Sequence, residues 1–301
     1  VPNNWDGLMT RFSWDFLDLD VGGGKFADAG ITNPNTPTSN GGITGAGNDE
    51  DKETVFYGLN ASLKNLPDVM KKLELMYVHV NSDAMGAAST FLPGYSGMSY
   101  SFDHFGLHTK GEFAIVDYRL DFGYQMGKEK GVVLTTGAAG TDITQSGTMF
   151  DIDLGVNFPE MMKARVSLGY HMDSGDDSAT TDKQEAYQPL FHDQHAFAGN
   201  MNMFGFGNLT NVRIGATLMP MEETTVGLAV HLLSRTSDKG TVNMLGANSG
   251  NFYTPVVAGT ATVASTDKSL GTEIDLWMKH NYGNGLSMLL SFSQFSPGSY
   301  L

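Results

Sequence analysis

The chain has 301 residues, of which 41% are hydrophobic and 17% charged, and it has no cysteine. Its mean hydropathy is −0.18 and it has no run of 18 apolar residues, which excludes a helical membrane protein but not a membrane β-barrel, whose strands face water on one side. The formal net charge of −15 argues against nucleic-acid partners, because these need a basic surface.

Alternation of apolar and polar residues predicts the first strands, because successive side chains of a strand point to opposite faces. Residues 7–21 form the first predicted strand, in which the alternation slips at Phe16-Leu17 and indicates a bulge. A loop rich in Gly, Asn and Thr follows at 22–53. The next predicted strands are 54–64, 71–81 and 99–112, with a short turn at 65–68 and a loop at 82–98.

The clearest strands lie in the middle of the chain, at 117–126 and in a hairpin between Met149 and Asp173. In the first arm of this hairpin, apolar residues such as Ile152 and Leu154 alternate with Asp151 and Asp153. Each arm is about ten residues long, the length of a tilted strand that crosses a bilayer. The last predicted strands are 209–219, 224–235, 269–280 and 285–295, and the long loops are 127–146, 174–207 and 236–267.

Short and long connections alternate along the predicted chain. This asymmetry is typical of an outer-membrane barrel, which has short periplasmic turns and long external loops. Loops this long argue against a soluble up-and-down barrel, and the repeat of about 40 residues that marks a β-propeller is absent. We therefore predict that residues 1–301 form a single all-β domain, an antiparallel transmembrane β-barrel in the outer membrane of a Gram-negative bacterium.

The predicted count of about 11 strands is odd, whereas single-chain bacterial barrels have even counts and two periplasmic termini. With this count, the first strand starts on the periplasmic side and the last ends on the outer side. We therefore expect a fragment of a larger even-numbered barrel, incomplete at its C-terminus and at its N-terminus as well.

The polar faces of the predicted strands carry charges of both signs. Selection of anions by a pore requires one sign to dominate its constriction. The arginines could select anionic solutes, or they could pair with aspartates of neighbouring strands and hold the wall together; both readings remain open. The candidate pore-lining residues are Arg11, Lys110, Arg119, Asp121, Asp151, Asp153, Arg165, Arg213, Arg235, Glu273 and Asp275.

Aromatic residues on apolar faces or at strand ends are predicted to form interfacial girdles. Among the aromatic residues of the last two strands, only Trp277 and Phe295 fall on the polar face by alternation, where a sugar could stack on them. The candidate girdle residues are Trp14, Tyr57, Tyr118, Tyr124, Phe158, Tyr170 and Tyr282.

Sites for catalysis or metal binding are not predicted. Ser167 and His171 share a face, but four residues along a strand separate them by roughly 13 Å, too far for a Ser-His pair. His192, Asp193 and His195 have the chemistry of metal ligands, but their loop spacing does not define a site. We therefore predict no enzyme activity, no metal and no cofactor.

Several motifs resemble the alginate-export family of outer-membrane porins, most closely within 187–301. They are Tyr187-Gln188-Pro189-Leu190-Phe191 with His195 and Gly199, Asn208-Leu209, Leu270-Gly271-Thr272-Glu273-Ile274-Asp275-Leu276, Phe295-Ser296-Pro297-Gly298 and, near the start, Trp5-Asp6-Gly7-Leu8. The resemblance implies a monomeric barrel of about 16–18 strands. It also implies a positively charged lumen for an acidic polysaccharide, whereas the polar faces here carry equally frequent anions.

We expect a passive outer-membrane channel for diffusion or export of polar or charged solutes, similar to the alginate-export porins. The alternative is a structural or partner-binding barrel, a sheath or anchor without free conductance. The expected partners are the lipid bilayer, lipopolysaccharide, a polar or anionic solute and another envelope protein.

Overall fold

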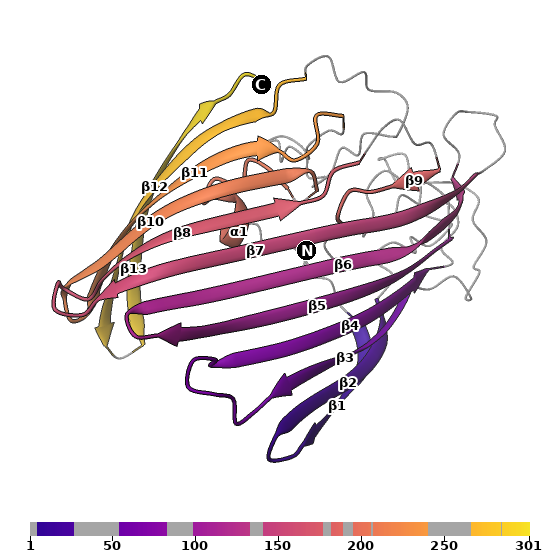
Figure 1. The fold of residues 1–301 in the computed structure, drawn as a ribbon, viewed down its shortest axis with the longest axis horizontal. Helices are drawn as coiled ribbons and strands as arrows, with labels where there is room; N and C mark the ends of the chain where they lie inside the picture. Colours follow the sequence, from indigo (N-terminus) through magenta and orange to yellow (C-terminus); the bar gives the residue numbers. More distant parts are fainter. Residues whose placement is uncertain are drawn as a thin grey trace, which may run out of the picture.

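The computed structural model describes residues 5–26, 54–82, 99–132, 141–176, 182–188, 195–205, 207–239, 266–283 and 285–301. In these residues the chain forms one curved sheet of 13 strands, with a four-residue helix beside it (Figure 1). None of the helical structure described has the length and hydropathy of a membrane span. The elements are β1 (Trp5–Ser13), β2 (Leu17–Phe26), β3 (Thr54–Leu63), β4 (Lys72–Ser82), β5 (Ser99–Phe113), β6 (Val116–Val132), β7 (Thr141–Phe158), β8 (Ala164–Asp173), β9 (Lys183–Gln184), α1 (His195–Ala198), β10 (Leu209–Met221), β11 (Thr224–Arg235), β12 (Ser269–Gly283) and β13 (Leu286–Pro297).

All strands except β9 follow one another across the sheet in sequence order, and each of their neighbouring pairs is antiparallel. β9 pairs in parallel with β7, at Thr144 and Gln145. Within the described ranges, β1 and β13 are each paired on one side only, so the sheet is open. The predicted all-β, antiparallel fold class is confirmed.

Short and long connections lie at opposite ends of the sheet (Figure 1). In Figure 1 the strand ends that the short connections join lie at the left and the bottom of the sheet, and the strand ends that lead to the long connections lie on the opposite side. The connections after β1, β3, β5, β7, β10 and β12 are 14–16, 64–71, 114–115, 159–163, 222–223 and 284–285, and those after β2, β4, β6, β8 and β11 are 27–53, 83–98, 133–140, 174–208 and 236–268. The predicted alternation of short and long connections is confirmed except at 133–140, which has eight residues, as many as 64–71.

The alternation of side chains gives the sheet two chemically different faces. On the outer face, large apolar side chains remain exposed, for example Leu168 at 55% and Ile214 at 50%. On the inner face of the same two strands, His171 and Arg213 are buried. Contiguous apolar exposure on this scale is typical of a surface that faces a membrane or a partner. Other exposed apolar residues of the outer face are Leu59, Leu75, Phe105, Phe122, Leu154, Val166, Leu228, Ile274, Leu276 and Phe292.

The first predicted strand, 7–21, is wrong, because these residues form two strands. β1 and β2 are joined by a tight turn in which the Trp14 N–H donates a hydrogen bond to the Leu17 carbonyl at 2.8 Å, and Ser13 is paired with Asp18. The slip at Phe16-Leu17 thus marks a reversal of the chain rather than a bulge. Counted over the described residues, the strands that follow sequence order are even in number, and β1 starts and β13 ends on the side of the long connections.

Two predicted loops also contain regular structure. β6 continues to Val132 and β7 begins at Thr141, so most of the predicted loop 127–146 is strand. The predicted loop 174–207 contains β9 and α1. At the ends of β6 and β7, polar and glycine residues interrupt the apolar alternation while still pairing through their backbones, so the pattern did not predict these ends.

Leu168→Arg is expected to destabilise the protein in a lipid bilayer by about 2–4 kcal/mol, because a cation near the midplane must leave water. An exposed position of a protein in water would tolerate the same change within about 0.5 kcal/mol. Urea titration of the protein folded into lipid vesicles measures the free energy of unfolding. Leu168→Ile is the control, and equal stability of the two variants would argue against a lipid-facing outer face.

Candidate functional site

Most charged residues of the wall lie on the inner face of the sheet. By strand register, every predicted pore-lining residue lies on this one face. That these residues line an open pore stays a prediction. They are Arg11 on β1, Lys110 on β5, Arg119 and Asp121 on β6, Asp151 and Asp153 on β7, Arg165 on β8, Arg213 on β10, Arg235 on β11, and Glu273 and Asp275 on β12.

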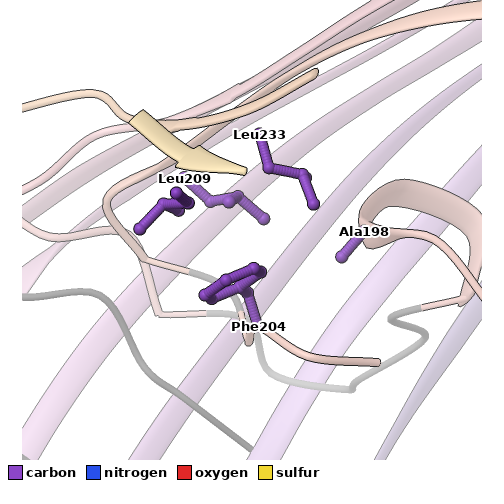
Figure 2. Close-up of a cluster of buried hydrophobic side chains, with 5 residues drawn as sticks. Ala198, Phe204, Leu209 and Leu233 are labelled. Carbon is purple, nitrogen blue, oxygen red and sulfur yellow. The ribbon is translucent and has the colours of Figure 1, made fainter. Parts of the chain in front are cut away.

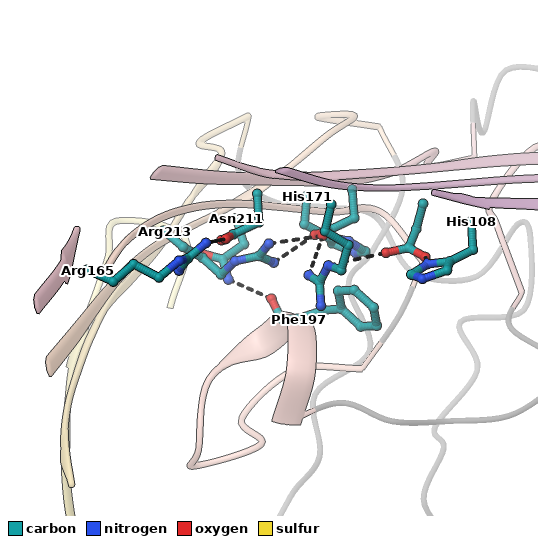
Figure 3. Close-up of polar contacts among 10 residues, drawn as sticks. His108, Arg165, His171, Phe197, Asn211 and Arg213 are labelled. Carbon is teal, nitrogen blue, oxygen red and sulfur yellow. Dashed lines mark hydrogen bonds and ion pairs between the residues drawn. The ribbon is translucent and has the colours of Figure 1, made fainter. Parts of the chain in front are cut away.

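Asp151 lies at the centre of the largest group of charges. Its side chain is fully buried and accepts two hydrogen bonds from Arg213, at 2.7 and 3.0 Å. Arg119 donates to the same carboxylate at 2.7 Å, and His171 Nδ1 lies 3.4 Å from Asp151 Oδ2. Figure 3 shows Arg213 and His171 converging on this face. A buried carboxylate is tolerated only when it is paired, so these contacts from β6, β8 and β10 make the charge on β7 possible.

Two further groups extend the network towards the short connections and across to β5 (Figure 3). Arg165 donates to Asp117 at 2.6 and 2.9 Å and to Asp153 at 2.6 Å. His108 Nδ1 lies 2.6 Å from Asp121 Oδ1. These aspartates neutralise the wall cations locally, which favours the ion-pairing reading of the arginines.

Arg11 and Arg235 lie towards the two sides of the sheet. Arg11 Nε donates to Asp20 at 2.6 Å, and its side chain remains 65% exposed. Arg235 is buried and donates to the backbone carbonyl of Asp267 at 2.6 Å. Its guanidinium lies 4.1 Å from the centre of the Tyr300 ring. Both arginines are therefore held by the protein itself.

Lys110 is held less tightly than these arginines. It is exposed on the inner face, directly opposite Lys72 on β4 and Arg119 on β6. Of the carboxylates that the structure describes, none is within ion-pair distance of Lys110, whereas Lys72 pairs with Glu74 at 2.9 Å. The described inner face thus offers few unpaired cations to an anionic solute.

Part of the connection between β8 and β10 folds back onto the inner face. We call residues 182–188, 195–205 and 207 of this connection the docked segment. Within it, Phe197 of α1 stacks on His171 with ring centroids 4.9 Å apart. The Phe197 carbonyl accepts a hydrogen bond from Asn211 Nδ2 at 2.6 Å (Figure 3). The segment therefore covers the charged centre of the wall.

Buried wall carboxylates accept hydrogen bonds from backbone N–H groups of the docked segment. The bonds run from Met201 to Glu273 at 2.8 Å, from Asn200 to Asp275 at 3.3 Å and from Gly207 to Asp173 at 3.2 Å. Leaving a buried carboxylate without donors is costly. The docked segment therefore stabilises the wall as much as the wall holds the segment.

Tyr187 anchors one end of the docked segment against glycines of β6 and β7. A Cβ at Gly123 would lie 2.9 Å from the Tyr187 hydroxyl, and a Cβ at Gly147 would lie 2.7 Å from Tyr187 Cα. These glycines leave the room that the close approach requires. Burial raises the pKa of the Tyr187 hydroxyl well above its usual value, so this side chain stays uncharged.

An apolar cluster anchors the other end (Figure 2). Ala198 and Phe204 of the docked segment pack with Leu209, Leu233 and Leu270, and all five are buried. Burial of one such large side chain stabilises the arrangement by about 1.5–3 kcal/mol. On β13, Phe295 also packs against this cluster, with its ring 5.7 Å from that of Phe204, as its inner-face phase predicted.

The predicted girdle aromatics lie on the outer face or at its short-connection end. Trp14 is in the β1–β2 turn, and the Tyr118 hydroxyl donates to the Val69 carbonyl beside another short connection. Their role at a membrane interface stays a prediction. The remaining members are Tyr57 on β3, Tyr124 on β6, Phe158 on β7, Tyr170 on β8 and Tyr282 on β12.

Of the loop residues considered as metal ligands, the structure describes only His195. His192 and Asp193 lie outside the described residues, and His195 begins α1. Among the residues that are described, no group of three or more His, Cys, Asp or Glu side chains could hold a metal ion.

Comparison with known proteins identifies one family. A family model described as Alginate export matches residues 7–301. The match includes the region 187–301, in which the resemblance is densest in the sequence, and extends over the strands that precede it. Among curated proteins, none matches the chain.

Arg213→Ala is expected to lower the free energy of unfolding by about 3–5 kcal/mol, since it leaves a buried carboxylate with one partner fewer. The control is Arg11→Ala, which removes an arginine with the same partner type from an exposed site and is expected to cost much less. Denaturant titration of both variants in the same lipid vesicles gives the comparison. Losses of equal size would contradict a structural role specific to the buried pair.

Proposed function

The chain belongs to the alginate export family, and from this premise we propose that it is an outer-membrane export channel through which polar solutes pass along the inner face of the sheet. The family is one of outer-membrane porins and transporters, not of enzymes.

The division of the sheet into two faces is the observation that carries the proposal. The outer face exposes large apolar side chains from β1 to β13, such as Phe12, Leu168 and Phe292. The inner face carries charged and polar side chains on the same strands. A wall of this kind suits lipid on one side and water on the other. A soluble protein would bury the apolar face instead.

The pairing of the inner-face charges supports a solute of low net charge. Arg119, Arg165 and Arg213 all donate to aspartates of the wall. A polyanion would have to displace these aspartates to reach the guanidinium groups, and displacement would leave carboxylates buried and unpaired. We therefore infer that these arginines brace the wall rather than attract an acidic polymer.

The docked segment supports a narrowed path. It lies on the face along which a solute would move, and it is held by wall carboxylates, by Tyr187 and by the cluster around Phe204. Because both ends are anchored, the segment stays on this face and reduces the cross-section of the path. The segment thus limits the size of the solute, and the paired charges of the wall limit its net charge.

Single-channel recording of the full-length protein in planar bilayers tests this function. We expect open, ohmic current steps and, under a salt gradient, a reversal potential near zero or on the side of cation preference, since the wall arginines are paired. Strong anion preference would contradict the bracing role. Absence of current in protein shown to be folded would contradict the channel and favour a structural or partner-binding barrel.

Gly199→Val is expected to enlarge the current steps, because a Cβ at this position would lie 2.5 Å from Glu273 Oε1, and because its φ of 90° favours glycine. The substitution should push the docked segment off the wall. Gly285→Val is the matched control, since Gly285 has a φ of 80° but no neighbouring atom within 4 Å of an added Cβ. Equal step sizes in both variants would show that the segment does not limit conduction.

A further inference from the structure

A group of polar side chains lies on the outer face, where a lipid-facing wall has no need of them. His79 on β4 and Ser101 and Asp103 on β5 belong to this face, as does Tyr77. They lie at the end of the strands that leads to the long connections. Lys72 lies at the end of β4 that follows a short connection. His79 lies roughly 24 Å further along the same strand. The group is therefore placed near the outer boundary of a bilayer spanned by the sheet.

The contacts within this group run from aspartate to histidine to serine, as in the catalytic triad of a serine hydrolase. Asp103 Oδ1 lies 2.8 Å from His79 Nδ1, and Ser101 Oγ lies 3.5 Å from His79 Nε2. Donation from Nδ1–H to the carboxylate leaves Nε2 free to accept the serine proton. The distance of 3.5 Å is long for a hydrogen bond, and such contacts commonly tighten when substrate binds.

Neighbouring side chains fix the histidine and the aspartate. The Tyr77 hydroxyl donates to Asp103 Oδ1 at 2.7 Å. The Tyr57 ring stacks on the imidazole of His79 with centroids 4.8 Å apart. The imidazole is thus held from two sides, and it remains partly accessible, with 17% of its side chain exposed. Orientation of the base by a carboxylate is what a general base for serine requires.

Two polar residues flank the serine in strand register. Asn81 on β4 and Lys128 on β6 lie directly opposite Ser101, on the same outer face. Side chains in such cross-strand pairs start from Cβ atoms about 5 Å apart. An amide N–H and an ammonium group beside the nucleophile are the donors that an oxyanion needs.

We propose that Ser101, His79 and Asp103 form a hydrolytic site that cleaves carboxylic esters of acyl chains in the outer leaflet. Ser101 Oγ bonds to the acyl carbon while its proton passes to His79 Nε2. The ester C–O bond breaks, and the alcohol leaves with that proton. Water then attacks the acyl carbon and gives one proton to His79. The bond between this carbon and Ser101 Oγ breaks, His79 returns the proton to Oγ, and the fatty acid leaves. Asp103 is a positioning residue that acts through His79.

The surroundings of the group define the substrate class. Towards the short connections, exposed Leu75 and Phe105 continue the outer face below the site, and an acyl chain would lie along them. Towards the long connections, exposed Lys128 would face an anionic head group. A phospholipid and an acyl chain of lipopolysaccharide share this chemistry. A water-soluble ester would gain nothing from the apolar side.

Labelling of the full-length protein with a fluorophosphonate, followed by mass spectrometry, tests the nucleophile directly. We expect the adduct on Ser101. Release of fatty acid is then measured in mixed micelles with phosphatidylethanolamine and, separately, with lipopolysaccharide, which distinguishes the two sources. Ser101→Ala is expected to lower release by at least about 100-fold. Ser234→Ala, which removes an outer-face serine on β11, is expected to leave it unchanged.

His79→Gln and Asp103→Asn are expected to slow labelling of Ser101, and Asp103→Glu to restore part of the rate, which a merely structural carboxylate would not do. All variants should keep the channel currents of the parent protein, which shows that they are folded. The proposal is overturned if the adduct does not form on Ser101, or if Ser101→Ala releases fatty acid as fast as the parent. Either result would leave these side chains as a polar belt at the membrane boundary.

Discussion

The buried carboxylate of Asp151 is the constraint on which the middle of the sheet depends. Its partners come from the three nearest strands in the sheet order, Arg119 on β6, His171 on β8 and Arg213 on β10. A shift of one residue in any of these strands would carry its partner to the outer face. The pairing of charge therefore fixes strand register as firmly as the segregation of apolar side chains does.

The pairing of opposite charges within the wall also explains how the docked segment is held. Glu273, for which the described residues offer no ion pair, accepts a hydrogen bond from a backbone N–H group of the segment instead. Such a bond needs no charged residue in the segment itself. The apolar contacts of Phe204 and Tyr187 then supply the hydrophobic part of the docking. The segment can thus lie on a charged face without a matching set of charges.

The sequence was sufficient for most of the strands and for the side of the wall on which each candidate residue lies, because one-residue alternation is a local pattern. It failed at Trp14, where a turn of only a few residues separates two alternating strands and resembles a bulge. It could not show the docking of Met201 onto Glu273, which are 72 residues apart. A local signal existed, since Gly123 and Gly147 interrupt strands at the places where Tyr187 approaches. The contact between Ser101 and His79 could not be predicted, because it joins two strands and depends on their register, which local alternation does not specify.

The same alternation lets the two faces serve different purposes, because neighbouring residues of one strand belong to different faces. Phe102 lies between Ser101 and Asp103 and points inward, where it packs with Val80 and is 7% exposed. This apolar contact holds β5 against β4 at the level of the outer-face group. A side chain that serves only packing on the inner face therefore aligns Ser101 and Asp103 with His79 on the outer face. The proposed ester chemistry on the outer face and the proposed conduction along the inner face can then coexist in one wall, since each depends on side chains that the other face does not present.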